Sequence, residues 1–216
     1  MSEDSGDEKT PAQRAGEGPF CILDAVVCVH YVGANLHRLL IKVLTAAQLV
    51  LLVPQEVCDE VEGKRHKYPQ IGDRWRRLTQ SSVVQILPAL LAADAPARVV
   101  EVLEDIRGLQ AEQALRQRRD LGEAVVVAHG VHLQEQGHEV YVAIDDQGGQ
   151  NLAADHDLTV LTIEDTLTLA IDGGHFATEG ELKKTYKKLR GFGDGMLPYE
   201  RTDLSETYRK WRPADR

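Results

Sequence analysis

Six acidic residues in four short segments have the types and the spacing to bind a metal ion together. Asp24 interrupts an apolar run over 20–27, and a second apolar run over 140–144 ends in adjacent aspartates. An unpaired buried carboxylate is costly, so acids at such places need a partner. A divalent cation can be shared by several carboxylates, and Mg²⁺ and Mn²⁺ are the hard ions that oxygen ligands select. The six acids are Asp24, Glu60, Asp120, Glu123, Asp145 and Asp146.

Each acid other than Asp24 also has a plain structural interpretation. Asp120 followed by Glu123 before an apolar run resembles a capping box at the start of a helix. Asp145 and Asp146 fit a turn and an N-cap, with glycines just behind them. Glu60 is one of several acids on its segment and fits a solvated helix face. The metal hypothesis therefore depends on the coincidence of all the acids.

The elements that must position these acids alternate between strand and helix from about 20 to 172, which predicts an α/β fold with a mostly parallel sheet. In such sheets, ligands bind outside the carboxyl ends of the strands, where Asp24, Asp145 and Asp146 are expected. The segment 69–80 is polar, with Trp75 as its large apolar residue, and no regular element is predicted for it. Strands are expected at 20–25, 49–53, 82–87 and 158–163, and a turn that leads into the fourth strand is expected at 137–146. Helices are expected at 34–47, 54–64, 120–136, 150–157 and 164–173, with two more between 94 and 119 that break near Gly108.

Length and composition are those of one globular domain with extensions: 216 residues, of which 43% are hydrophobic. Residues 1–18 are polar and charged, which predicts a disordered acidic tail. The domain is expected over 19–172 and a helical extension over 173–216. The three cysteines form no C-x-x-C pair and fit core positions in a reducing cytoplasm. Neither a signal peptide nor a membrane helix is predicted, so a soluble cytoplasmic protein is expected.

A net charge of −9 argues against a protein that coats nucleic acid, but the basic residues are clustered. A solvated helix face is the plain interpretation of each cluster. Histidines His129 and His132 form no H-E-x-x-H motif and are expected at the surface. No phosphate-binding glycine loop and no G-x-S-x-G motif follows a strand, so nucleophilic catalysis is not supported.

The order of the motifs resembles the PIN-domain ribonucleases over about 19–172. The matching pieces are LDAVV, then Pro54 to Glu60 as P-x-x-V-x-x-E, then D-x-G-E from Asp120, and finally VAIDD before NLAADHDLTVLT. The resemblance implies a three-layer α/β/α sandwich and cleavage of RNA with Mg²⁺ or Mn²⁺. Val26 departs from the pattern, because that family often has a small hydroxyl or amide residue two positions after the first aspartate.

Carried over onto this sequence, the resemblance implies catalytic roles for Asp24, Glu60, Glu123 and Asp146. Metal ligands would come from Asp24, Glu123, either Asp145 or Asp146, and Asp120 as a fifth acid. The mechanism implied is metal-assisted hydrolysis of a phosphodiester. The best candidates for holding the RNA backbone and a stacked base are the residues of one basic segment. These are Lys64, Arg65, Lys67, Arg74, Trp75, Arg76 and Arg77.

The expected partners are an RNA substrate and, if the chain is a toxin like many members of that family, an antitoxin. Another protein partner and a homodimer stay open, and no membrane partner is expected. The rival hypothesis is a catalytically inert PIN-like module that binds RNA or a protein. A third alternative, a phosphotransfer or phosphatase fold, would place paired acids after the first strand, where this chain has Asp24-Ala25-Val26.

Overall fold

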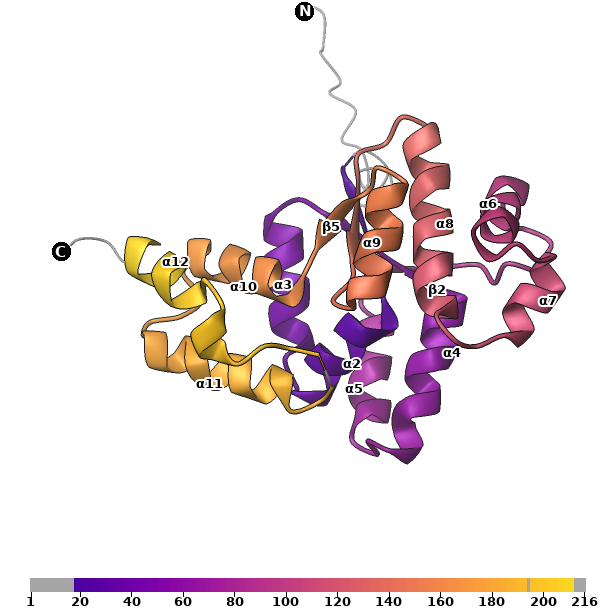
Figure 1. The fold of residues 1–216 in the computed structure, drawn as a ribbon. Coiled ribbons are helices and arrows are strands. Elements are labelled where there is room, and N and C mark those ends of the chain that lie inside the picture. The colour runs from indigo at the N-terminus through magenta and orange to yellow at the C-terminus, as the bar shows by residue number, and fades with distance from the viewer. Residues whose placement is uncertain (1–17, 194, 212–216) are drawn as a thin grey trace, which may run out of the picture.

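Five parallel strands form a single sheet with helices on both sides, so the predicted three-layer α/β/α architecture is confirmed (Figure 1). The computed structural model describes residues 18–193 and 195–211, and the predicted disordered tail lies almost entirely outside this range. The sheet order is β3-β2-β1-β4-β5. The strands are β1 (Phe20–Leu23), β2 (Val50–Pro54), β3 (Val84–Leu87), β4 (Val140–Ala143) and β5 (Thr159–Leu161).

The strand order creates a switch point between β1 and β4. From β1 the chain moves outward to β2 and β3, and it then returns to the other side of β1 to form β4 and β5. β1 is therefore the central strand, and all four of its residues are buried. Connections leave β1 and β4 in opposite directions, which opens a crevice at the carboxyl ends of these two strands.

The helices that surround the sheet include two, α2 and α5, that were not predicted. Helix α8 packs on β1 and β4, α3 packs on β2, and α5 packs on β3. The helices are α2 (Ala25–Gly33), α3 (His37–Ala46), α4 (Gln55–Gly63), α5 (Ile71–Thr79), α6 (Ala97–Arg107), α7 (Ala111–Arg116), α8 (Leu121–Glu135), α9 (Gln147–Asp155), α10 (Ile163–Asp172), α11 (Glu179–Arg190) and α12 (Leu204–Trp211), with short 3₁₀ turns at Lys64–His66 and Tyr199–Arg201.

The first apolar run is divided between a strand and a helix, whereas a strand over 20–25 was expected. β1 ends at Leu23, and the Asp24 carboxylate accepts a hydrogen bond of 3.0 Å from the Val26 amide, which starts α2. Helix α2 is buried on almost every side. A helix with no solvent face shows no 3.6-residue hydrophobic period, so its sequence has the appearance of a buried strand.

Helix α5 replaces the irregular segment expected at 69–80. Its buried residues Ile71, Trp75 and Leu78 lie at helical spacing on one face. Trp75 is 2% exposed and belongs to the main hydrophobic core. The ring therefore offers no free face to a nucleobase, and the expected stacking role of Trp75 does not fit the structure.

Replacing Trp75 by alanine should lower the free energy of unfolding by about 3–5 kcal/mol, the usual cost of removing a large aromatic side chain from a core. Chemical denaturation monitored by circular dichroism would measure this loss. Arg76→Ala on the exposed face of the same helix is the matched control and should change stability by at most about 0.5 kcal/mol. A Trp75→Ala protein as stable as the wild type would contradict the core assignment.

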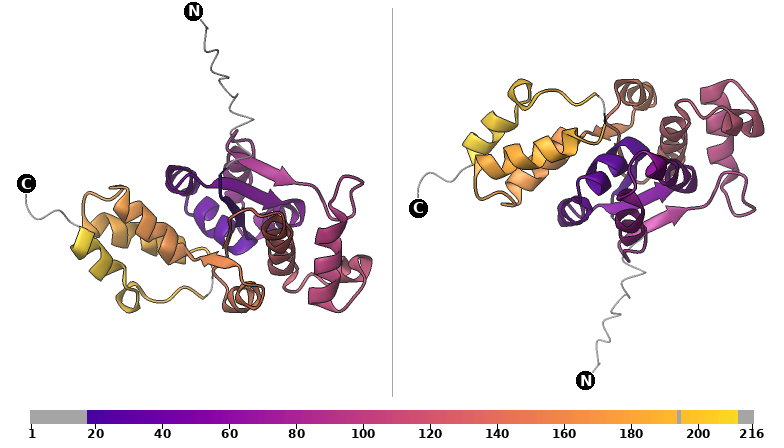
Figure 2. Two further views of the ribbon diagram at one scale, coloured as in Figure 1. Left: turned by 90° about the horizontal axis from the view of Figure 1, so that it is seen from above. Right: turned by 90° about the horizontal axis from the view of Figure 1, so that it is seen from below.

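The segment after β5 packs onto the same core as the sheet. Helix α12 lies against α10, and α11 contacts α2. Side chains of Leu182, Tyr186, Leu189 and Tyr208 join the main core cluster. Figure 2 shows these C-terminal helices and the α6–α7 pair at opposite ends of the molecule. The domain boundary at 172/173 stays a prediction.

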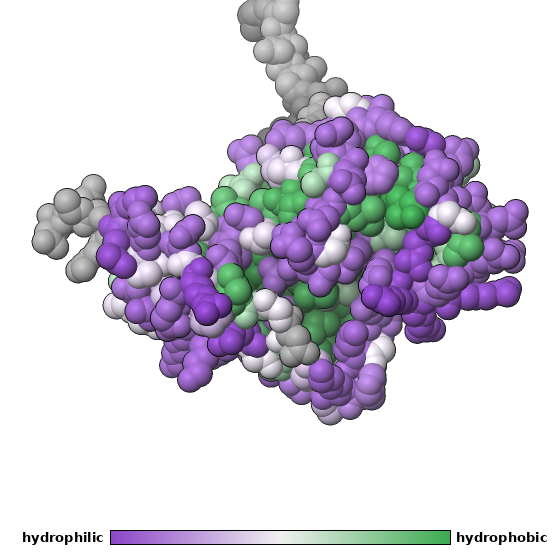
Figure 3. Space-filling view, viewed as in Figure 1, coloured by the Kyte–Doolittle hydropathy of each residue, from purple (hydrophilic) through white to green (hydrophobic). Residues whose placement is uncertain are grey.

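The outer surfaces of both ends are hydrophilic in Figure 3, and apolar residues are visible mainly in the hollowed middle of that face. A second, smaller apolar cluster joins α6, α7 and α8. Over 18–193 and 195–211, no helix has the length and apolar character needed to cross a membrane. The three cysteines are buried, which confirms the predicted core positions.

Candidate functional site

Asp24 and Asp146 follow the adjacent strands β1 and β4. Asp24 comes directly after Leu23, the last residue of β1, and Asp146 comes shortly after β4, which ends at Ala143. Asp24 is 2% exposed, and one of its oxygens caps α2. Asp146 caps α9 in the same way, because its Oδ1 accepts a hydrogen bond of 2.8 Å from the Gly148 amide. The N-cap predicted as an alternative for Asp146 is therefore present. Each cap fixes the orientation of a carboxylate at the switch point of the sheet.

The carboxylates of Glu60 and Asp24 both lie close to the backbone of Gly122, in the first turn of α8. A Cβ atom added to Gly122 would lie 2.9 Å from Glu60 Oε2 and 3.3 Å from Asp24 Oδ1. The absence of a side chain at Gly122 thus lets carboxylates from α4 and from the end of β1 approach the same backbone atom. Contacts between α4 and α8 hold the two helices in this arrangement.

Glu123 makes the corresponding approach to Asp146 over the start of α9. A Cβ atom at Gly148 would lie 3.0 Å from Asp146 Oδ1 and 3.9 Å from Glu123 Oε2. At Gly149 it would lie 2.9 Å from Glu123 Cγ. We refer to the two pairs, Asp24 with Glu60 and Glu123 with Asp146, as the acid cluster.

The charges of the acid cluster act on one another. Burial raises the pKa of Asp24 to about 6, against the hydrogen bonds from the Val26 and Ala25 amides, and repulsion from Glu60 and Asp146 raises it further. Burial also raises the pKa of Glu123 to about 7, and the charges of Asp146, Asp24, Asp120 and Glu60 add to the shift. Carboxylates with these environments are stabilised by a proton or by a cation.

Two of the acids predicted as metal ligands are directed elsewhere. Asp145 Oδ1 accepts a hydrogen bond of 3.0 Å from the amide of Ile163, the first residue of α10. Asp120 precedes α8 with a φ of 53° and makes no side-chain cap, so the predicted capping box is not formed. Its carboxylate pairs with Arg119 Nε at 3.3 Å, although its charge still reaches Glu123.

The acid cluster fits a hard divalent ion by chemistry, but its side chains are not drawn together around one point. In the described parts of the chain, no three His, Cys, Asp or Glu side chains are close enough to hold a metal ion. The donors of the cluster are all carboxylate oxygens, which Mg²⁺ and Mn²⁺ prefer. Binding of an ion would require the two pairs to move toward each other, with relief of their repulsion.

The basic segment predicted to bind RNA is divided by its contacts. Lys64 Nζ lies 3.4 Å from Glu60 Oε1, beside the acid cluster. Arg74 instead donates to the Gly33 carbonyl at 2.5 Å, at the end of α2 opposite to Asp24. The remaining bases contact groups outside the cluster. Arg65 pairs with Glu62, Arg76 pairs with Asp73, and the Lys67 ammonium lies over the Tyr68 ring. Burial lowers the pKa of His37, and the nearby charge of Arg77 adds to that shift.

His129 is buried, although it was expected at the surface. It is 3% exposed, and burial together with the charge of His132 lowers the pKa of its imidazole to about 4. A neutral, enclosed imidazole on the buried face of α8 fits a core position. Residues 124–128 of α8 are all apolar, so the sequence does not show which face of the helix is buried and gave no sign that His129 lies on it.

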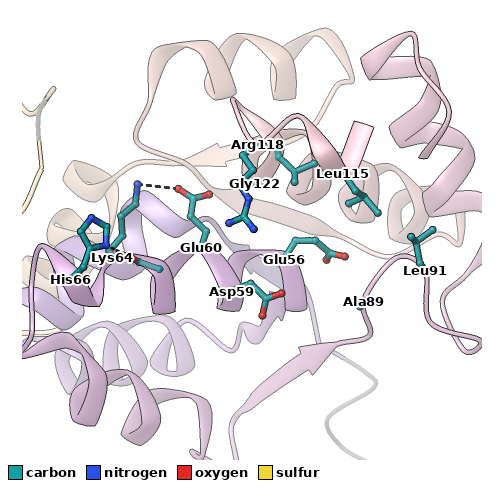
Figure 4. A pocket seen from close by; sticks show the side chains of 12 residues that line it. Glu56, Asp59, Glu60, Lys64, His66, Ala89, Leu91, Leu115, Arg118 and Gly122 are labelled. Atoms are coloured by element: carbon teal, nitrogen blue, oxygen red, sulfur yellow. Dashed lines mark hydrogen bonds and ion pairs between the residues drawn. The ribbon is translucent and has the colours of Figure 1, made fainter. Parts of the chain in front are cut away.

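A cleft of about 510 Å³ opens beside Glu60 and Gly122, between α4, the loop after β3 and the start of α8 (Figure 4). Of its other lining residues, Lys64 belongs to the basic segment predicted to bind RNA, and the sequence did not single out Glu56, Leu91 or Leu115. Glu56 and Lys64 come from one side, and Leu91, Leu115 and Arg118 come from the other. Arg107 holds the far side in place, because its guanidinium donates to the carbonyls of Gln117 and Arg119 at 3.0 and 2.9 Å.

Comparisons with family models, curated proteins and solved structures found no match for this chain. The site must therefore be interpreted from its own chemistry. Two pairs of carboxylates lie at the switch point of a parallel sheet, next to a cleft with cationic residues, and this is the chemistry from which a function can be proposed.

Replacing Gly122 by alanine should separate Asp24 from Glu60, because the new Cβ would meet both carboxylates at contact distances that real side chains rarely adopt. Stability should change by at most about 1 kcal/mol, because the helix propensity of alanine opposes the close contact of its Cβ with Asp24. Any divalent-ion response of the melting temperature should be reduced. Gly180→Ala in α11, where the nearest atom would be 3.7 Å away, is the matched control. An unchanged metal response in Gly122→Ala would show that the two carboxylates need not approach each other.

Proposed function

We propose that the protein is an endoribonuclease of the PIN type that depends on Mg²⁺ or Mn²⁺. The observation that carries the proposal is the position of the acid cluster, in which two pairs of carboxylates from four separate segments lie beside the carboxyl ends of β1 and β4. Burial raises the pKa values of Asp24 and Glu123, and repulsion among the acids adds to both shifts. These shifts support a cation site rather than a solvated surface. The resemblance in motif order points to the same class.

In this proposal Asp24 and Glu60 bind from one side and Glu123 and Asp146 from the other. A bound ion would acidify a water molecule and neutralise charge on the leaving oxygen. Asp24 and Asp146 are held by their helix caps, so their free oxygens keep a fixed direction. Lys64 beside Glu60 and Arg118 in the adjoining cleft would attract the phosphates of the substrate.

RNA is the proposed substrate, and an antitoxin is the proposed protein partner if the chain acts as a toxin. A cytoplasmic location is proposed as well, since three buried free cysteines suit a reducing compartment. Asp145 and Asp120 have no direct part in this arrangement. They support the start of α10 and the loop before α8.

A second candidate function is an inert module that binds RNA or a protein. It is favoured by the separation of the acids into two pairs, since no three of the described ligand-type side chains are close enough for an ion. Val26, which adds no hydroxyl or amide near Asp24, favours it as well.

The two candidates are distinguished by incubating the protein with a fluorescent single-stranded RNA and millimolar Mn²⁺. A nuclease should produce fragments that EDTA suppresses and that excess Mn²⁺ restores. RNA binding without fragments under Mg²⁺ and Mn²⁺ would reject the nuclease and favour the inert module. Glu60→Gln, which removes one charge from the cluster, separates the activity of this site from that of a contaminating nuclease.

A further inference from the structure

The cleft beside the acid cluster has an apolar end that is open to solvent. Leu91 is 60% exposed, and it lies at the same end of the cleft as Leu115 (Figure 4). Large apolar side chains in a concave site commonly contact a ligand. Lys64 and His66 line the opposite end, next to Glu60, so the cleft runs from the acid cluster to the two leucines.

Glu56 lies between these ends, and one of its two carboxylate oxygens has no hydrogen-bond partner among the described residues. Its Oε1 accepts a hydrogen bond of 2.8 Å from the Leu90 amide, which fixes the carboxylate against the loop after β3. Its Oε2 is buried and, within the residues that the structure describes, has no hydrogen-bond partner. A buried acceptor without a partner is costly, so a donor would be favourable there. Neighbouring atoms cover this oxygen, and a ligand in the cleft reaches it once the Glu56 carboxylate turns toward the cleft.

The charges that line the cleft limit the kind of ligand that could supply a donor to Glu56. Glu56, Asp59 and Glu60 line one wall, so an anionic group is repelled from the centre of the cleft. The cations Lys64 and Arg118 lie where a phosphate could be accommodated. A flat, neutral group that carries a donor fits the space between Glu56 and the leucines. An unpaired nucleobase has these properties, and a carboxylate accepts well from an exocyclic amino group.

We infer that this cleft binds an unpaired base adjacent to the scissile phosphate, and that Glu56 selects a base with an amino group, cytosine or adenine, over uracil. The inference rests on the proposed function for its RNA substrate. Glu56 is a specificity residue here, since it contacts the base rather than the acid cluster. The leucines supply apolar contact to any base and make no distinction among them.

Binding of short oligouridines with one central uracil replaced by cytosine or adenine tests the inference. Fluorescence anisotropy in EDTA measures affinity with no metal-dependent cleavage. Wild-type protein should bind the cytosine or adenine oligomer about tenfold more tightly than oligouridine, the usual worth of one good base contact. Glu56→Gln should reverse this preference. Its amide oxygen still accepts from the Leu90 amide, and its NH₂ group then faces the base and donates to a uracil carbonyl.

Two further variants serve as controls. Leu115→Ala should weaken all the oligomers about equally and leave the preference unchanged. The guanidinium of Arg98 pairs with Glu135 at the far end of α8, so Arg98→Ala should change neither the affinity for the oligomers nor the base preference. A wild-type protein without a base preference, or a preference that survives in Glu56→Gln, would overturn the inference. The nuclease proposal is tested separately, because a Glu56-dependent preference without Mn²⁺-dependent cleavage would reject the nuclease alone, and cleavage without a preference would reject the base site alone.

Discussion

Replacing Asp24 by asparagine should abolish RNA cleavage and leave the fold at least as stable as that of the wild type. Asparagine keeps an oxygen that can accept from the Val26 amide, so α2 remains capped. It removes the negative charge that a cation needs. The rate of cleavage at saturating Mn²⁺ should fall by at least about 100-fold. Losing a residue that only hydrogen-bonds to a metal ligand already costs about 10- to 100-fold, and Asp24 is itself a proposed ligand.

The stability effect of Asp24→Asn should depend on pH. Because burial raises the pKa of Asp24 from 3.8 to about 6, the wild-type protein is destabilised progressively as the pH rises from about 4 to 6. Above pH 6 without metal, the variant should be more stable by roughly 1–3 kcal/mol. Below pH 4 the difference should vanish, because the aspartate is then protonated in both states.

Urea titrations at pH 4 and pH 8 would measure this difference, with Asp105→Asn on the exposed face of α6 as the control for net charge. Cleavage by Asp24→Asn at the wild-type rate would reject Asp24 as a ligand. A variant that is less stable at pH 8 would instead show that the charged carboxylate supports the fold.

The sheet could be predicted because its strands are short, β-branched and followed by turns or helix starts. β2 and β4 appear as continuous apolar runs, which is typical of parallel strands covered on both faces. Helix α2 was not predicted because its residues are buried on almost every side, so its sequence is also a continuous apolar run and resembles a buried strand. Helix α5 did have a helical signal in the spacing of Ile71, Trp75 and Leu78, and it was missed because Trp75 alone was counted as an apolar anchor.

The acid cluster was predictable only in part. Acids at the ends of neighbouring parallel strands must lie close together, and this rule brought Asp24 near Asp146. The choice between Asp145 and Asp146 depends on which of them caps α9, and two adjacent aspartates leave that choice open in the sequence. Glu56 had no signal in the sequence, because the amide that fixes it belongs to Leu90, 34 residues further along the chain.

Millimolar Mn²⁺ should raise the melting temperature of the wild-type protein by several degrees. An ion that binds the folded state alone stabilises it by mass action, by about 1.4 kcal/mol at ten times its dissociation constant. For a chain of this size, that corresponds to about 3–6 °C. Changing Glu123→Gln and Asp146→Asn together should remove the shift, and the asparagine still caps α9. The paired change Asp105→Asn with Glu112→Gln removes the same charge from exposed positions and should leave the shift intact.

The metal-induced shift should itself depend on pH, because protons compete with the ion for the same oxygens. Glu123 has a pKa of about 7 and Asp24 a pKa of about 6, so both must lose a proton before they can bind. The shift should be full at pH 8, fall as the pH drops through 7, and be nearly absent at pH 5. Differential scanning fluorimetry across this range, with and without Mn²⁺, measures it. A shift of equal size at pH 5 and pH 8, or one that survives the double change, would place the ion on ordinary exposed carboxylates away from the acid cluster.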